Sequence, residues 1–251
     1  MDEYQDDYFS LEKKRMRIAF VPTLVFICLL WLIFVLDATL NLRLYQYGVY
    51  PLATKGVPGI FLSPFFHRSA KHLFSNTLPL IVLMWCLYYF YSEIANKTFL
   101  FLWVLSGFIT WIIGREAWHI GASGVIYSLS FFLFFSGIFR KHIPLIAISL
   151  IVAFLYGSTV WNMLPWSMLL DPSVSWEGHL SGGISGLIVA IAFHKHGPQK
   201  PTKIWEEDEE EEESIDDFLD AILDARDSEA KGDDEGGVRS RSHRLPNRLA
   251  L

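Results

Sequence analysis

The sequence predicts an all-α polytopic membrane protein, a bundle of six transmembrane helices with a long structured outer loop after the first of them. Three observations lead to this fold class. Of the 251 residues, 52% are hydrophobic and 16% are aromatic, and the mean hydropathy is +0.30, which is well above the mix of a soluble domain. A window of about 19 residues finds separate apolar stretches long enough to cross a bilayer. The Lys and Arg residues between these stretches are numerous on one side and fewer on the other, as fixed orientation requires.

The predicted spans are 18–36, 72–91, 99–113, 121–139, 143–160 and 178–193. If they alternate in direction, most of the flanking positive residues share one side of the membrane: Lys13, Lys14, Arg15, Arg17, Lys97, Arg140, Lys141, Lys195, Lys200 and Lys203. The other side holds Arg43, Lys55, Arg68, Lys71 and Arg115. Because cytoplasmic loops carry the excess of Lys and Arg, both termini are predicted to be cytoplasmic.

Three parts of the chain are predicted: a cytoplasmic N-terminal segment at 1–17, a membrane domain at 18–196 and an acidic cytoplasmic tail at 197–251. The first part is acidic before it is basic, and no small-residue cleavage site follows the apolar stretch, so we expect the first span to be a retained anchor. The loop from Asp37 to Lys71 is long and rich in Gly, Pro and aromatic residues. This composition favours a membrane-embedded or surface-lying subdomain over a plain linker.

The tail begins with a run of acidic residues, WEEDEEEEESIDD, which is typical of a solvated, disordered spacer. Behind a start that resembles a capping box, apolar residues recur at helical spacing at Ile215, Phe218, Leu219, Ile222 and Leu223. The pattern predicts a short amphipathic helix. It either docks on a cytoplasmic partner or is a marginal helix that ends the chain, and both interpretations stay open.

The two cysteines, Cys28 and Cys86, both lie in apolar runs, so the sequence predicts neither a disulfide framework nor a cysteine metal site. There is no His-Glu-x-x-His motif, and His67 and His72 are five residues apart, a poor spacing for sharing an ion on one helix. We expect no metal, no cofactor and no nucleic-acid partner.

Four polar side chains lie at membrane depth, where such groups are costly and are therefore candidates for function. His72 and Asn76 open the second span, Ser123 the fourth and His179 the sixth. All three spans enter from the outer side, so the four side chains are expected at similar depth, with His72 and Asn76 on one helix face. Each has an ordinary alternative: Ser123 as a packing residue bonded to its own backbone, Asn76 as an interhelical hydrogen bond.

Small residues surround two of these side chains. Gly182 and Gly186 form a small-xxx-small face on the helix of His179, and a Gly-Ala-Ser-Gly cluster contains Ser123. Such faces mostly serve close helix packing. A hydroxyl and an imidazole brought together by that packing favour a nucleophile and its general base.

In this hypothesis Ser123 attacks a carbonyl after giving its proton to a neutral His179, which later returns the proton to the leaving amine. The side chains of His72 and Asn76 and the backbone N–H of Ser123 supply hydrogen-bond donors for the oxyanion. Tyr127, one turn below Ser123, either holds the imidazole in place or is an ordinary packing residue, and spacing alone does not decide.

Three motifs in order make the sequence similar to the rhomboid intramembrane serine proteases. They are His-x-x-x-Asn at His72 and Asn76, Gly-x-Ser-Gly around Ser123, and His-x-x-Gly-x-x-x-Gly from His179. The resemblance covers nearly the whole membrane region, 18–194. Single motifs of this kind are weak, but three on the expected helices are a strong indication of the family.

The resemblance implies a Ser–His dyad without a third carboxylate that cleaves single-pass transmembrane substrates near the outer membrane face. It counts Gly121 among the oxyanion residues and Gly124 among the supporting ones, stacks Tyr127 on the dyad imidazole, and makes the first loop a membrane-embedded side structure. Glu177 is expected to be a helix-start carboxylate rather than a triad acid. The implied partners are transmembrane proteins and membrane lipids, in the inner membrane of a bacterium.

Two departures from the family pattern stand out. The segment NLRLYQYGVYPL replaces a Trp-Arg pair common in the first loop, and Gly178 replaces the Ala often found before the sixth-helix His. Two other functions remain open. A transporter would also place polar groups at membrane depth, but the chain lacks a visible internal repeat. A catalytically inactive rhomboid-like binding protein would lose the dyad, whereas this chain retains Ser123 and His179.

Overall fold

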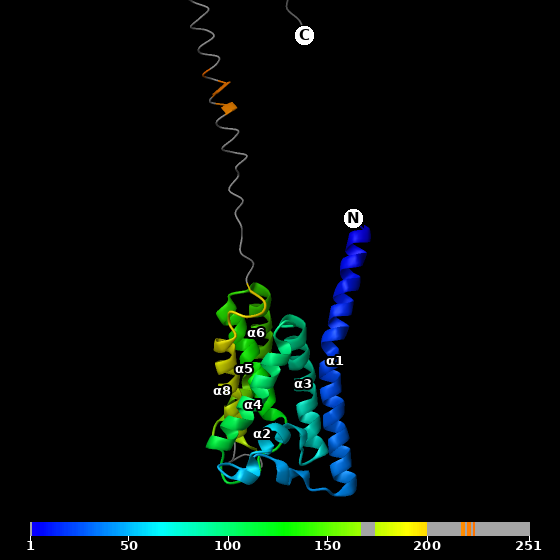
Figure 1. Cartoon of the computed structure of the whole chain (residues 1–251), viewed down its shortest axis with the longest axis vertical. Coiled ribbons are helices and arrows are strands. Elements are labelled where there is room, and N and C mark those ends of the chain that lie inside the picture. The colour runs from blue at the N-terminus through cyan, green and yellow to red at the C-terminus, as the bar shows by residue number, and fades with distance from the viewer. Residues whose placement is uncertain (1, 167–173, 200–216, 219, 222, 224–251) are drawn as a thin grey trace, which may run out of the picture. The chain divides into compact units, whose positions relative to one another are not determined.

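The structure is a computed structural model that describes residues 2–166, 174–199, 217, 218, 220, 221 and 223 (Figure 1). The chain forms two units, Met1–Lys200 and Pro201–Leu251. In the second unit the five described residues are helical, with Phe218 and Leu223 exposed. The predicted acidic spacer apart from its last residue, Asp217, the basic end of the tail and the remaining apolar positions of its helix lie outside the described residues.

Among the described residues of the first unit, four helices are long and apolar enough to cross a membrane. They are α1 (Asp2–Leu40), α3 (Ala70–Phe90), α4 (Ala95–Ile113) and α5 (Ser123–Arg140). The predicted all-α, multi-pass membrane fold is therefore confirmed. The first expected span lies within α1, and the next three coincide with α3, α4 and α5 to within a few residues.

The fifth and sixth expected spans correspond to shorter helices. The apolar helix α6 (Ile143–Tyr156) gives way at Gly157 to the 3₁₀ helix η4 (Gly157–Met163). Helix α8 (Trp176–Ala192) has 17 residues, with the polar Glu177 and His179 in its first turn. By length and composition these two are not among the candidate spans, so the count of six stays a prediction.

Helix α5 is the centre of the bundle and contacts α3, α4, α6 and α8. Its apolar window is 61% buried, against 33% or less for the other three candidate spans. Leu129, Phe132 and Leu133 on α5 are fully buried. Figure 1 shows α1 on the flank of the bundle, packed against α3. The helix that begins with Ser123 is thus the most firmly enclosed one.

Glycines let α5 and α8 approach closely. A Cβ atom added at Gly182 would collide with the backbone oxygen of Gly124, and one added at Gly186 would collide with the backbone oxygen of Ser128. The backbones therefore touch along this line, which small residues alone permit. The contact places the first turn of α8 beside the first turn of α5.

The long loop after α1 is built of short helices: η1 (Leu44–Tyr47), η2 (Thr54–Gly56), α2 (Gly59–Leu62) and η3 (Ser63–Phe65). Val49 and His119 exchange two backbone hydrogen bonds of 3.0 and 2.8 Å, which form an isolated antiparallel bridge. Helix α2 packs against α4. These contacts attach the loop to the segment that leads into α5.

At the opposite end of α5, Arg140 joins this helix to the end of α8 and to the segment that follows α8. Its side chain donates to Ser136 Oγ at 2.8 Å and to the carbonyl oxygens of Phe193, His196 and Pro198 at 2.6 to 3.0 Å. Arg140 is 5% exposed. A helix leaves its last carbonyl groups without intrahelical donors, and here one guanidinium from α5 satisfies carbonyls at and beyond the end of α8.

Candidate active site

Ser123 is the first residue of α5, so its backbone N–H is among those that a helix leaves without an intrahelical acceptor. The preceding turn depends on Gly121, whose φ of 109° is a conformation that residues with a Cβ rarely adopt. A Cβ atom at Gly121 would also lie 2.7 Å from Cε1 of His72. Gly121 thereby brings the loop against α3 just before the serine.

His179 lies in the first turn of α8, where Ser175 is the N-cap and its Oγ accepts from the Gly178 N–H at 3.1 Å. The imidazole Nε2 of His179 is 3.0 Å from Oγ of Ser123, although the two residues are 56 positions apart in the chain. This is a hydrogen-bonding distance. The structure thus brings the predicted nucleophile and the predicted base into contact.

The second ring nitrogen of His179 sets its tautomer. Nδ1 lies 3.1 Å from the backbone oxygen of Asn162 in η4, and a carbonyl can only accept. The proton is therefore assigned to Nδ1, which leaves Nε2 free to accept from the Ser123 hydroxyl. The ring of Tyr127 stacks on the imidazole at a centroid distance of 4.4 Å and an angle of 17°.

His72 and Asn76 lie around Gly121, as the hypothesis of an oxyanion pocket requires. A Cβ atom built on Gly121 would come 2.9 Å from Nε2 of His72 and 3.8 Å from Nδ2 of Asn76. Asn76 is buried, and Ser69 caps the helix that carries both residues. Two side chains that are expected to stabilise an oxyanion thus lie against the glycine two residues before Ser123.

His67 lies beside Asn76, and its place there was not predicted. Its Nε2 lies 3.0 Å from Nδ2 of Asn76 and 3.4 Å from the backbone N of Ala122. Two donors therefore point at one nitrogen, which assigns Nε2 as an acceptor. Burial lowers the pKa of His67 to about 3, with His72 acting in the same direction and the Phe65 carbonyl opposing them.

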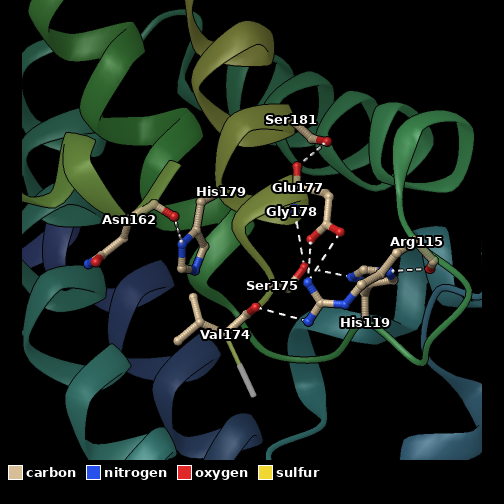
Figure 2. A network of polar contacts seen from close by, with 9 residues as sticks. All are labelled: Arg115, His119, Asn162, Val174, Ser175, Glu177, Gly178, His179 and Ser181. Carbon is tan, nitrogen blue, oxygen red and sulfur yellow. Dashed lines mark hydrogen bonds and ion pairs between the residues drawn. The ribbon is translucent and has the colours of Figure 1, made fainter. Parts of the chain in front are cut away.

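A polar network links the loop before Ser123 with the start of α8 (Figure 2). Nη1 of Arg115 lies 3.2 and 3.1 Å from the two carboxylate oxygens of Glu177, and its Nη2 donates to the Val174 carbonyl at 3.1 Å. Nδ1 of His119 lies 2.6 Å from Oγ of Ser175. The carboxylate of Glu177 is thus turned to Arg115, which agrees with its expected role at the helix start.

His119 is held as a neutral ring. Its Nε2 lies 3.0 Å from the backbone oxygen of Arg115, so this nitrogen carries the proton, and Nδ1 accepts from the Ser175 hydroxyl. Burial lowers the pKa of His119, while the hydrogen bond to the Arg115 carbonyl and the charge of Glu177 oppose the shift and the charge of Arg115 adds to it. The ring therefore serves as a fixed link between loop and helix.

A cavity of about 30 Å³ lies beside Ser123. Polar groups of Ser106, Thr110, His119 and Ser175 contribute to its lining. A space of this size and polarity accommodates a water molecule but no amino-acid side chain of a substrate.

The fold and the site together define a multi-pass, all-α membrane protein with a hydrogen-bonded serine–histidine pair between two of its helices. The Rhomboid domain family model matches residues 55–196. The chain is also 33% identical over 187 residues to uncharacterized protein Rv1337 of Mycobacterium tuberculosis. These residues make up 72% of this chain and 78% of that protein. With uncharacterized protein ML1171 of Mycobacterium leprae it shares 30% identity over 214 residues, 81% of this chain and 82% of that protein. The chain belongs to the rhomboid family.

Four features of the site had no sequence prediction: the Asn162 carbonyl, His67, the partner of Glu177 and the link between His119 and Ser175. The carbonyl leaves no signal, because any residue could supply it. His67 and His119 were visible only as polar residues next to predicted site residues. Glu177 and Arg115 were visible only as opposite charges on the predicted outer side.

Proposed function

We propose that the protein is an intramembrane serine endopeptidase that cleaves single-pass transmembrane substrates near the outer membrane face. The observation that carries the proposal is the 3.0 Å separation of Ser123 Oγ and His179 Nε2, in a chain of the rhomboid family. The carbonyl partner of Nδ1 supports the tautomer that a general base needs.

The chemistry follows from this geometry. Nε2 of His179 takes the hydroxyl proton as Oγ of Ser123 bonds to the carbonyl carbon of the substrate. The carbonyl oxygen becomes an oxyanion, which His72, Asn76 and the N–H of Ser123 stabilise. When the C–N bond breaks, His179 gives its proton to the leaving amine, and an acyl-enzyme remains. Water then attacks the ester with His179 again as base, which releases the new carboxyl end and restores Ser123.

The pair acts as a dyad in this proposal. A triad would need an acid at Nδ1 of His179, but that nitrogen faces the Asn162 carbonyl, and Glu177 is engaged with Arg115. The stacked ring of Tyr127 restrains the imidazole, and the buried Ala122 and Val125 on either side of Ser123 restrain the start of α5. Both reacting groups are thus oriented by packing and by backbone contacts.

The proposed location is a bacterial cell membrane, with both termini in the cytoplasm and the site near the outer face. The distribution of Lys and Arg supports this orientation. A catalytically inactive rhomboid-like binding protein is the alternative. It is disfavoured because such a protein has no need of a base in the correct tautomer beside a serine.

Covalent labelling tests the proposal. Purified protein in detergent is treated with a fluorophosphonate, the modified residue is mapped, and cleavage of a model transmembrane substrate is followed. We expect modification at Ser123 and cleavage by the wild type, and neither in Ser123→Ala or His179→Ala protein that remains folded. Cleavage that persists in either variant, with contaminating proteases excluded, would refute the dyad, and a folded wild type that is neither labelled nor active would identify a binding protein.

A further inference from the structure

The loop before Ser123 and the first turn of α8 are held together by an ion pair. Figure 2 shows the guanidinium of Arg115 reaching from the loop to the carboxylate of Glu177 and to the carbonyl of Val174. The Glu177 side chain is 3% exposed and that of Arg115 is 30% exposed. A buried carboxylate needs a partner of opposite charge, and removal of that partner is strongly unfavourable. Arg115 therefore fixes where the start of α8 lies.

A second contact acts in parallel. The Ser175 hydroxyl donates to Nδ1 of His119 at 2.6 Å, and its oxygen accepts from the Gly178 N–H, so the N-cap of α8 is itself attached to the loop. His119 is in turn fixed by its backbone bridge to Val49. Ser175 stands four positions before His179, and His119 stands four positions before Ser123.

The glycine contact between α5 and α8 holds the turns of α8 that follow His179. Gly182 and Gly186 bring the backbones together, and the Cβ atoms of Tyr127 and Phe131 on α5 lie over these two glycines. Glu177 precedes His179, and its side chain is held by Arg115 instead. The proton transfer depends on a separation of 3.0 Å. A misplacement of about 1 Å costs about 100-fold in rate.

We propose that Arg115 and Glu177 are positioning residues, which align His179 with Ser123 by holding the first turn of α8 against the loop that leads into α5. This role rests on the proposed function of the dyad. Neither side chain touches the reacting groups. They act through the backbone of α8, in which Glu177 is two residues before His179, and through the carbonyl of Val174.

The first test compares Glu177→Gln with the wild type. We expect the rate of fluorophosphonate labelling at Ser123 and the kcat of substrate cleavage to fall about 10-fold to 100-fold, with KM changed less than about twofold, since the dyad and not the substrate contact is displaced. Arg140→Gln is the matched control, because Arg140 also joins α5 to α8 but at the far end. It should label at the wild-type rate per folded molecule. Wild-type labelling by the Glu177→Gln variant would overturn the proposal.

Arg115→Lys separates the charge from the geometry. Lysine keeps the charge for Glu177 but has no planar fork that reaches the Val174 carbonyl at the same time. We expect an intermediate loss of labelling rate. If Glu177→Gln does not fold, Arg115→Lys replaces it as the test. A labelling rate at Ser123 equal to that of the wild type would then contradict the positioning role.

A second measurement does not depend on catalysis. The ¹⁵N resonances of the His179 ring, assigned with His179→Ala, report the hydrogen bond from Ser123. We expect Ser123→Ala to displace the Nε2 signal. Glu177→Gln should displace it in the same direction, and Arg115→Lys takes the place of this variant if Glu177→Gln does not fold. Arg140→Gln should leave the signal unchanged. An unmoved signal in Glu177→Gln, or in Arg115→Lys where that variant is used instead, would overturn the positioning role. A wild type that neither labels nor cleaves would refute the proposed protease, while this resonance would still decide whether the ion pair aligns the two residues.

Discussion

A hydrogen bond of 2.6 Å joins Nδ1 of His119 to Oγ of Ser175, and the contact between Ser123 and His179 is its counterpart four residues further along both segments. In both pairs the partners are 56 positions apart. Each pair joins an imidazole to a serine hydroxyl, but with the roles of the two segments exchanged. His119 and Ser175 are held by the backbone bridge to Val49 and by the cap of α8. In the pair of Ser123 and His179, the hydroxyl proton faces a nitrogen that can accept it. A fixed contact thus lies four residues before the proposed catalytic pair on each segment.

Asn76→Ala should lower turnover far more than it weakens substrate binding. A donor directed at the oxyanion acts chiefly in the transition state, and loss of one such donor costs about 100-fold to 1,000-fold in turnover. His72 and the N–H of Ser123 remain in this variant, so the lower end of the range is expected. The measurement is kcat and KM on one preparation, together with its thermal unfolding midpoint.

His67→Ala is the comparison for Asn76, because it removes the buried contact between the two side chains, together with the acceptor of the Ala122 N–H, and leaves the Asn76 amide in place. If Asn76 served only to bind His67, the two variants would lose the same amount of stability and both would keep their turnover per folded molecule. That outcome would remove Asn76 from the oxyanion pocket.

The stability of the protein should decrease in acid partly through His67. Its pKa is lowered from the ordinary 6.5 to about 3 in the folded protein, so between these values the unfolded chain binds a proton that the folded chain does not. The free energy of unfolding therefore falls as the pH falls from about 6.5 toward 3. We expect His67→Gln to show a shallower decrease of the unfolding midpoint across this range. Equal slopes for variant and wild type would mean that His67 accepts a proton without loss of structure.

The sequence alone was sufficient to predict the long apolar helices α1, α3, α4 and α5. It was also sufficient to identify the candidate site residues whose side chains are chemically distinctive. Ser123 and His179 could be paired because each opens a predicted span that enters from the same side. The ion pair of Arg115 and Glu177 could not be predicted, because Arg115 lies in a loop whose path depends on the bridge between His119 and Val49. Opposite charges far apart in a sequence have no spacing rule that identifies them as partners.

The shorter helices show that hydropathy does not predict where a helix changes its backbone geometry. Hydropathy predicted a fifth span to residue 160, but α6 ends at Tyr156 and a 3₁₀ helix follows. Mean hydropathy is insensitive to such a change in backbone geometry. That 3₁₀ helix supplies the Asn162 carbonyl to His179, so the irregular segment is also a part of the site.

The predicted orientation can be tested with single cysteines in a Cys28→Ser and Cys86→Ser background. Thr54 in the first loop and Lys141 after α5 are both exposed, and the Lys and Arg distribution places them on opposite sides of the membrane. In intact cells a membrane-impermeant thiol reagent should label Thr54→Cys, and Lys141→Cys only after the cells are opened. Labelling of Lys141→Cys in sealed cells would place the candidate site on the cytoplasmic side.

Arg140→Gln should destabilise the protein without changing the chemistry of the dyad. The buried guanidinium donates to three carbonyl oxygens at the end of α8 and beyond it, and a glutamine amide is too short and has too few donors to reach them all. Hydrogen bonds from a charged group contribute about 1.5 to 3 kcal/mol each, and unsatisfied buried acceptors add to the cost. Since Gln can satisfy part of the set, we expect a net loss of about 2 to 4 kcal/mol. Unfolding in a graded detergent series measures this loss, and active-site labelling per folded molecule is the readout for the dyad. A variant as stable as the wild type would mean that water replaces the guanidinium at this end of the bundle, while a lower labelling rate in the folded fraction would mean that the two ends of α8 are mechanically coupled.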